Sequence, residues 1–400
     1  MREDLEKAKI SLTAKALALY FVVLPLDFVP IQSLGSVTKI VALLPLICFL
    51  FESHGRISFW KNTIAKWLIA FTILAVLSIL YTINFDRTFS TLKTLLLNVL
   101  LVLLIADCKL YTVYEREYLQ KALVVGSILA AIMLLAMVFS GYGGSGGYYG
   151  TGRYTVTVGD VAQDPNYFCG YLLFGFSYFF ARGLKEKPLI NFIVVFGFIG
   201  VALVTGSRGG FLALVICAIA VFILSGKEEN KLKLILLSII GLLVAILFIR
   251  FIIPMINADL LKRFTIEYIA ENGTTNRFEI WGSMLKRFSE GDVLNQFFGF
   301  GYGTSTQLSN SGKTVAHNLY IDDLAYVGYV GLFLQIGFQV SGIKTALKNH
   351  SYLYVAILIS MICLCMTLSL TSYKPLWSVM MMIMIEDNSK KWLGENIPIN

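Results

Sequence analysis

Long apolar stretches, separated by short polar connections, run through almost the whole chain. A stretch of roughly 17–22 apolar residues has the length that an α-helix needs to cross a membrane. We therefore predict an all-α polytopic membrane protein with about twelve transmembrane helices. The predicted helices lie near 12–31, 35–51, 65–83, 89–106, 119–140, 165–181, 189–206, 210–225, 231–253, 318–341, 352–370 and 375–386.

The positive charges gather in the connections on one side of this predicted bundle. The connections on the side of the N-terminus carry Arg56, Lys61, Lys66, Lys109, Arg116, Lys121, Arg182, Lys185, Lys187, Lys227, Lys231, Lys233, Lys344, Lys348, Lys390 and Lys391. The opposite short connections carry Arg87, Arg153, Arg208 and Lys374. Because cytoplasmic loops of membrane proteins are enriched in lysine and arginine, we expect both termini in the cytoplasm.

The composition agrees with a membrane protein. Of the 400 residues, 57% are hydrophobic and 14% are charged, which is more apolar surface than a soluble domain of this length needs. The net charge of +8 says less than the positions of the lysines and arginines, and we expect no nucleic-acid partner. No internal repeat is visible, which weighs against transporters built from duplicated halves.

Two connections on the side opposite the termini are long. The first, 141–164, is rich in glycine and tyrosine, which favours a mobile aromatic loop. The second, 254–316, is long enough for a small outer domain or lid. Within it, apolar residues at helical spacing after Asn276, with Glu279 three residues later, predict an amphipathic helix near the membrane surface. The chain thus divides into 1–253 with helices one to nine, the extracytoplasmic loop domain 254–316 between helices nine and ten, and 317–400 with helices ten to twelve and a cytoplasmic tail.

Arg208 lies between two apolar runs in FIGVALVTGSRGGFLALVICAIAVF (198–222). An arginine at the centre of a bilayer costs at least ~2.5 kcal/mol, and such residues usually have a function. The glycines around it permit a tight turn, and a helix N-terminus with an arginine forms an anion site, most naturally for a phosphate at a membrane surface. The alternative is an interface arginine that reaches the headgroups. Arg277 offers a second bidentate donor, or is a surface charge, and Arg153 is a third candidate.

His317 is the one histidine predicted to face outward. His54 and His350 fall in cytoplasmic connections, whereas His317 joins the large loop to helix ten in GKTVAHNLYIDDLAYVGYVGLF. A histidine at such a junction is either structural or catalytic. Asp322 and Asp323, just inside helix ten, could hold a polar group near His317, bind a cation, or lie outside the helix.

The remaining patterns in the outer segments do not indicate a nucleotide-binding site or a metal site. GFGYG (299–303) resembles a nucleotide-binding loop only as a string, because no strand precedes it and no GKS follows it. We interpret it as a flexible turn that leads to the His317 segment. No outer group of carboxylates has the spacing of a metal site, so we expect no obligatory metal and no cofactor.

With these residues placed, the sequence resembles the superfamily of O-antigen ligases and Wzy-type repeat-unit polymerases of bacterial surface polysaccharides. VTGSRGGFLAL (204–214) resembles its Ser-Arg-Gly-Gly turn, AHNLYIDDLAYVGYVGLF (316–333) its His-Asn block, and GRYTVTVGDVAQDPNYF (152–168) an outer segment with an arginine and an Asp-Pro-Asn. The likeness covers roughly 150–340. Family members often have an acidic residue where this chain has Tyr326, so another group, such as Asp322, would have to orient His317.

The resemblance implies a glycosyltransferase of the bacterial cytoplasmic membrane with an extracytoplasmic active site. The donor would be a glycan on polyprenyl (undecaprenyl) pyrophosphate, and the acceptor a second glycan. The pyrophosphate would bind Arg208, Arg277 and Arg153. His317 would take the proton from the attacking sugar hydroxyl. The supporting residues would be Asn318, Asp322, Ser207, Gly209, Asp164 and Asn166.

Three functions remain open. A polymerase, which we favour, joins lipid-linked repeat units into O-antigen, capsule or exopolysaccharide by metal-independent glycosyl transfer. A ligase moves the glycan to lipid A–core or another acceptor. A transporter or flippase for lipid-linked sugars would form no covalent product, but the informative charges lie at outer helix ends instead of along the helices. Besides the bilayer and the two glycans, we expect a chain-length regulator and a flippase of the same pathway as partners.

Overall fold

The computed structural model describes residues 10–31, 35–52, 62–140, 153–225, 277–309, 315–369 and 371–393, with isolated positions between 243 and 267. This part of the chain is 79% helical. Its strands form two short antiparallel pairs, β1 (Pro30–Ile31) with β2 (Gly35–Ser36) and β3 (Thr157–Val158) with β4 (Val161–Ala162). The predicted all-α class therefore holds for the described residues.

The helices follow the order of the predicted spans. The first half contains α2 (Leu12–Val22), η1 (Leu24–Leu26), α3 (Val37–Val41), α4 (Leu43–Glu52), α5 (Thr63–Leu77), η3 (Ser78–Leu80), α6 (Phe85–Leu100), the π-helical η4 (Leu101–Asp107) and α7 (Val113–Phe139). The second half contains α8 (Pro165–Lys185), α9 (Pro188–Val204), α10 (Arg208–Ser225), α15 (Arg277–Ser289), α16 (Val293–Phe298), α17 (Ser305–Leu308), α18 (Leu319–Lys348), α19 (Tyr352–Cys365) and α20 (Lys374–Leu393). The predicted amphipathic helix is α15, which buries Met284 and Phe288.

Local sequence explains where several of these helices begin. The first backbone N–H groups of a helix lack partners within it, and a polar side chain just before the helix can accept from them. Asn62 caps α5 in this way, and Asp164 caps α8, with Pro165 at the first helical position. Thr112 and Glu115 form a capping box at α7. These residues fix the helix boundaries before any tertiary packing is considered.

Several helices suit a membrane. Within the described residues, four are long and apolar enough to cross one, namely Thr63–Leu80, Phe85–Asp107, Val113–Phe139 and Leu319–Lys348. Shorter apolar helices are Leu12–Val22, Pro188–Val204, Arg208–Leu224 and Tyr352–Cys365. Every predicted span within the described residues overlaps a helix, whereas 231–253 lies outside them apart from isolated positions. The protein is a membrane protein, and the number of twelve spans stays a prediction.

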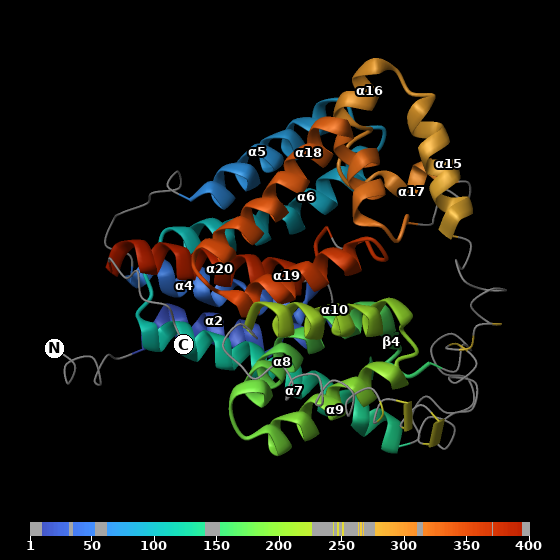
Figure 1. Cartoon of the computed structure of the whole chain (residues 1–400). Helices are drawn as coiled ribbons and strands as arrows, with labels where there is room; N and C mark the ends of the chain where they lie inside the picture. The colour runs from blue at the N-terminus through green and yellow to red at the C-terminus, as the bar shows by residue number, and fades with distance from the viewer. Residues whose placement is uncertain are drawn as a thin grey trace.

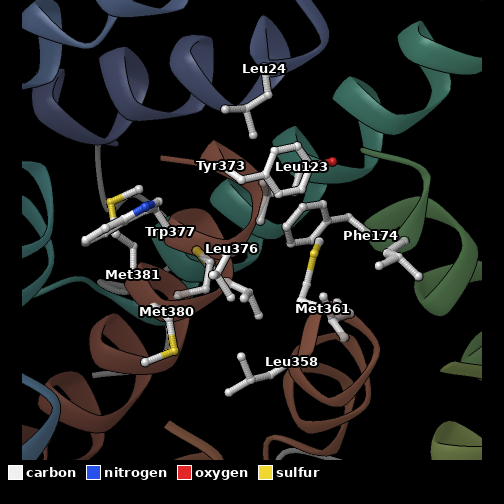
Figure 2. Close-up of a cluster of buried hydrophobic side chains, with 14 of the residues drawn as sticks. Leu24, Leu123, Phe174, Leu358, Met361, Tyr373, Leu376, Trp377, Met380 and Met381 are labelled. Atoms are coloured by element: carbon white, nitrogen blue, oxygen red, sulfur yellow. The ribbon is translucent and has the colours of Figure 1, made fainter. Parts of the chain in front are cut away.

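The long helices pack side by side, and α15, α16 and α17, which belong to the predicted outer domain, lie at one end of them (Figure 1). α18 packs along α5, α10 lies against α8 and α19, and α7 contacts α2 and α8. Part of the buried core surrounds α20 (Figure 2), with side chains that include Leu123, Phe174, Leu358, Met361, Trp377, Met380 and Met381. α15, α16 and α17 contact α18 near its start, which is the end that carries His317, and β4 lies beyond the end of α10 on the same side of the picture (Figure 1).

Several predicted spans differ from the observed helices in their ends or are interrupted, and the first and last spans show why. The span 12–31 is interrupted, because α2 ends at Val22 and the short helix η1, with Pro25 as its second residue, follows it. The last span does not end at 386, because α20 continues to Leu393. Its polar extension is held by other helices: Asn62 Nδ2 donates to Asp387 Oδ2 at 3.0 Å, and Asn388 Nδ2 donates to the Ala106 carbonyl at 3.1 Å. The length of an apolar run in the sequence does not reveal these hydrogen bonds.

The GFGYG segment is packed into the helix bundle, so the interpretation as a flexible turn is wrong. α18 is kinked at Gly328, where φ is 66°, and the kink leaves two carbonyls of the preceding turn without helical partners. The GFGYG segment supplies the missing donors: Phe300 N donates to Ala325 O at 2.8 Å and Gly301 N donates to Tyr326 O at 3.1 Å. A Cβ on Gly301 would lie 2.1 Å from Thr82 Oγ1. The glycines are therefore required for close packing.

A buried ion pair ties the N-terminal segment to α20. Lys374 Nζ lies 2.5 Å from Asp27 Oδ1, and the two side chains are 3% and 20% exposed. Removing one partner of such a pair leaves an uncompensated charge and costs roughly 3–5 kcal/mol. We expect Lys374→Met to lower the thermal unfolding midpoint in detergent clearly, and the double variant Asp27→Leu, Lys374→Met to recover part of the loss. Lys121→Met, in an exposed pair with Glu117, is the control and should change the midpoint little. An unchanged midpoint in Lys374→Met would contradict this.

Candidate active site

The Ser-Arg-Gly-Gly turn joins α9 to α10. Gly206 has φ of +61°, a conformation that glycine adopts without strain. Ser207 Oγ accepts from Gly210 N at 3.0 Å, so Ser207 caps α10 and Arg208 is its first residue. A Cβ on Gly210 would lie 2.3 Å from Cys169 Sγ. The turn is thus pressed against α8, and the half-buried Arg208 stands at a helix N-terminus as predicted.

The turn is held by residues from the outer segment before α8. Arg153 is buried, and its Nε donates to Thr205 O at 2.9 Å while its Nη2 donates to Asn166 Oδ1 at 2.9 Å. Ser207 Oγ donates to the same Asn166 oxygen at 2.9 Å. Asn166 is fixed in turn by Asp164 Oδ1, which accepts from its backbone N at 2.7 Å and from its Nδ2 at 2.9 Å. The structure therefore brings the predicted residues of these two motifs together in one network. The glycine-rich part of the predicted loop, 141–152, lies outside the described residues.

Arg263 is a contact that the sequence did not single out. It lies in the predicted outer domain 254–316, outside the motifs quoted from the sequence. In the structure Arg263 Nε donates to Gly206 O at 3.2 Å, at the same turn as Arg208. Nothing in its sequence neighbourhood marks it, because only the fold brings residue 263 to residue 206.

Just before α18, hydrogen bonds hold the backbone on both sides of His317. Trp281 Nε1 of α15 donates to Ala316 O at 2.6 Å, and Ala316 N donates to Asp322 Oδ1 at 3.3 Å. Asn318 caps α18 by accepting from Tyr320 N at 3.0 Å. His317 itself has φ of 51°, in the left-handed region that few non-glycine residues adopt. Its Nδ1 is buried without a hydrogen-bond partner among the described residues.

The two aspartates of α18 differ in what they contact. Both lie within α18, so the alternative that they lie outside the helix does not apply, and both are fully buried. Asp322 Oδ1 accepts from Ser305 Oγ at 2.5 Å and from the Ala316 backbone, so it acts on the segment before His317. The oxygens of Asp323 have no hydrogen-bond partner among the described residues. Tyr326, the position at which the resemblance implies an acid, is buried with its ring centroid 5.3 Å from that of Tyr302.

Charges of the predicted site residues act on one another. Burial lowers the pKa of His317 below its ordinary value of 6.5, the Arg277 guanidinium lowers it further, and the Asp164 carboxylate opposes both. Burial also lowers the pKa of Arg277; Asp164 raises it and Arg208 lowers it. Since such effects require proximity, the structure brings Arg208, Arg277, His317 and Asp164 into one electrostatic environment. A single cavity lined by the two arginines and the histidine stays a prediction.

Replacing Arg277 and replacing Asp164 should shift the pH dependence of the rate in opposite directions. If neutral His317 is the active form, the rate falls as pH drops through its pKa, which lies below 6.5. Arg277→Gln removes a charge that lowers this pKa, so the acid limb of the kcat/KM profile should move to higher pH. Asp164→Asn removes a charge that raises it, so the limb should move to lower pH, and asparagine remains a good helix cap. The position of the limb is read independently of the maximal rate. Shifts of the same sign in both variants would contradict the arrangement.

No three histidine, cysteine, aspartate or glutamate side chains gather into a potential metal site among the residues that the structure describes. Arginine side chains, among them Arg208 and Arg277, bring positive charge to this region, and the helix N-terminus at Arg208 adds a partial positive charge.

Residues 192–336 match the family model described as O-antigen ligase. The match runs from α9 into α18, and so contains Arg208, Arg277 and His317 together. It confirms the resemblance to the O-antigen ligase and Wzy superfamily and supports a ligase- or polymerase-type function. A comparison with curated proteins found no match.

Proposed function

We propose that this membrane protein, with its O-antigen ligase match at 192–336, is a polymerase of lipid-linked glycans. It would join polyprenyl-pyrophosphate-linked oligosaccharide repeat units into a surface polysaccharide on the outer face of the bacterial cytoplasmic membrane. The observation that carries the proposal is structural: the Ser207 turn holds Arg208 at the N-terminus of α10, and Arg277, whose charge lowers the pKa of His317, begins α15. Two arginines beside a histidine suit an anionic leaving group and a proton acceptor.

The arginines would act on the leaving group. As the bond between the anomeric carbon and the phosphate oxygen breaks, that oxygen gains negative charge and polyprenyl pyrophosphate departs. Arg208 and Arg277 are each the first residue of a helix, α10 and α15. Fixed cations at helix N-termini stabilise the transition state more than the ground state, because the charge grows during the reaction. Arg153 was also predicted to bind pyrophosphate, and its bonds to Thr205 and Asn166 favour a positioning role for it.

His317 would act on the acceptor. The acceptor hydroxyl oxygen forms the new bond to the anomeric carbon, and its proton passes to the imidazole, which later returns it to water. A pKa below the ordinary value keeps this imidazole neutral, and able to accept a proton, near pH 7. Asp164 would then stabilise the imidazolium that forms. Asp322 and Trp281 would be positioning residues, since both hold the Ala316 backbone next to the histidine.

A ligase is the second candidate, and the printed description of the matching family, O-antigen ligase, favours it. The chemistry at the donor would be the same. Only the acceptor would differ: lipid A–core or another molecule in place of a second lipid-linked repeat unit.

The purified protein, mixed with a short polyprenyl-pyrophosphate glycan, distinguishes these functions by mass spectrometry of the products. A ladder of glycans supports a polymerase. A single transfer onto lipid A–core supports a ligase, and the absence of any covalent product would contradict both and favour transport. EDTA added to the same assay should change the rate little, because arginines supply the positive charge. If EDTA abolishes glycosyl transfer and added Mg²⁺ restores it, a metal ion would take the role proposed for the arginines, and Asp322 and Asp323 would be its candidate ligands.

A further inference from the structure

A groove with a cavity of about 330 Å³ lies between α5 and α18. These two helices run side by side (Figure 1). The groove is lined by the start of α5, by the last turns of α18 and by Asp387 and Lys391 of α20, whereas His317 precedes the first turn of α18. It is therefore at the opposite end of α18 from the candidate active site and belongs to a different part of the molecule.

One half of the groove is apolar. Gly337 lies directly against Trp67, since a Cβ on the glycine would be 2.4 Å from the indole Cε3 atom. The indole also packs edge-on against Phe333, with ring centroids 5.5 Å apart. Val340, one turn further along α18, is 39% exposed beside it. A tryptophan and an aliphatic residue at a helix end form a wall of the kind that contacts hydrocarbon near a membrane interface.

The other half is basic. Lys344 and Lys348 lie one turn apart on α18, and both are exposed. Neither forms an ion pair with a described residue. The third lysine, Lys391, pairs with Asp387. That buried carboxylate also accepts from Asn62 at 3.0 Å and from Asn349 at 3.1 Å, so its bonds are taken up within the protein.

We propose that this groove binds one anionic phospholipid of the surrounding bilayer. Its phosphate would contact Lys344 and Lys348, and one acyl chain would lie along Trp67 and Val340. The charge and the apolar wall together point to this occupant: two ammonium groups at the end of a membrane helix, without an ion-pair partner among the described residues, attract anionic headgroups, and the adjoining wall suits an acyl chain, which a free phosphate lacks.

The test is lipid retention by the full-length protein, measured by native mass spectrometry after delipidation. Phosphatidylglycerol and phosphatidylcholine with identical acyl chains are added separately. We expect phosphatidylglycerol to bind about 30-fold more tightly, which is the size expected for two lysines at a membrane surface. The double variant Lys344→Gln, Lys348→Gln should lose this preference. Lys15→Gln with Lys121→Gln removes the same charge from exposed positions outside the groove and should keep it.

The apolar half has its own variant. Val340→Trp fills the groove from a partly exposed position, and should weaken phosphatidylglycerol binding although both lysines remain; monodisperse gel filtration checks its folding. Equal retention of phosphatidylcholine, or wild-type retention by the double lysine variant, would overturn the proposal. Displacement of the lipid by inorganic phosphate would identify a free-phosphate site and overturn it as well.

Discussion

Replacing His317 should abolish glycosyl transfer while donor binding stays close to that of the wild-type protein. A general base contributes roughly 100- to 10,000-fold to the rate, whereas the donor pyrophosphate would be held by Arg208 and Arg277. The two effects are measured separately: product formation by mass spectrometry, and binding of a short polyprenyl-pyrophosphate glycan by thermophoresis. Loss of donor binding in a folded variant would make His317 a binding residue. An unchanged rate would remove its assignment as a base and reopen the transport alternative.

The backbone at His317 decides which substitution is the better test. Its φ of 51° lies in the left-handed region, which asparagine adopts more readily than alanine does. His317→Ala therefore loses the base and also strains the segment between Ala316 and Asn318. His317→Asn loses the base with less strain, so its thermal unfolding midpoint should be the higher of the two while both are inactive. Activity in His317→Asn alone would show that the backbone, and not the imidazole, is what the reaction requires.

The sequence predicted the helices well because their signals are local. The length of each apolar run and the capping residues Asn62, Asp164 and Asn318 act within a few residues of the helix that they start. The end of α20 was missed because distant contacts decide it, whereas the interruption of the span 12–31 at Pro25 is a local effect. Whether α20 stops at 386 depends on the partners of Asp387 and Asn388, which lie on other segments.

In the candidate site, too, local patterns in the sequence indicated some residues, whereas other contacts arise only from the fold. Arg208 and His317 could be singled out because an arginine between apolar runs and an outward histidine are unusual in themselves. The contact of Arg263 with Gly206 joins residues 57 positions apart, and no pattern near either residue indicates it. The GFGYG glycines were misread for a related reason: glycine signals either mobility or close packing, and only the kink at Gly328 shows which applies.

Arg208→Lys should impair glycosyl transfer although it keeps the positive charge. A guanidinium can bridge two phosphate oxygens, whereas an ammonium acts as a point charge. Arg208→Ala, which removes the charge as well, should cost ~100-fold or more in rate, the usual effect of losing one fixed donor in an active site. Neither change touches Ser207, which caps α10, or the Asn166 side chain that holds it, so both variants should fold.

The same two substitutions at Arg182 are the matched control. Arg182 lies near the far end of α8 and pairs with Glu186 in an exposed position, so its variants should transfer glycan at the wild-type rate. If Arg208→Lys retains the full rate while Arg208→Ala is inactive, only the charge matters and the bidentate contact is wrong. If Arg208→Ala is fully active, Arg208 is an interface anchor, and the explanation for an arginine in this apolar stretch is its position at the headgroups. A graded series, with wild type above lysine and lysine above alanine, is the result that an arginine bound to a departing pyrophosphate requires.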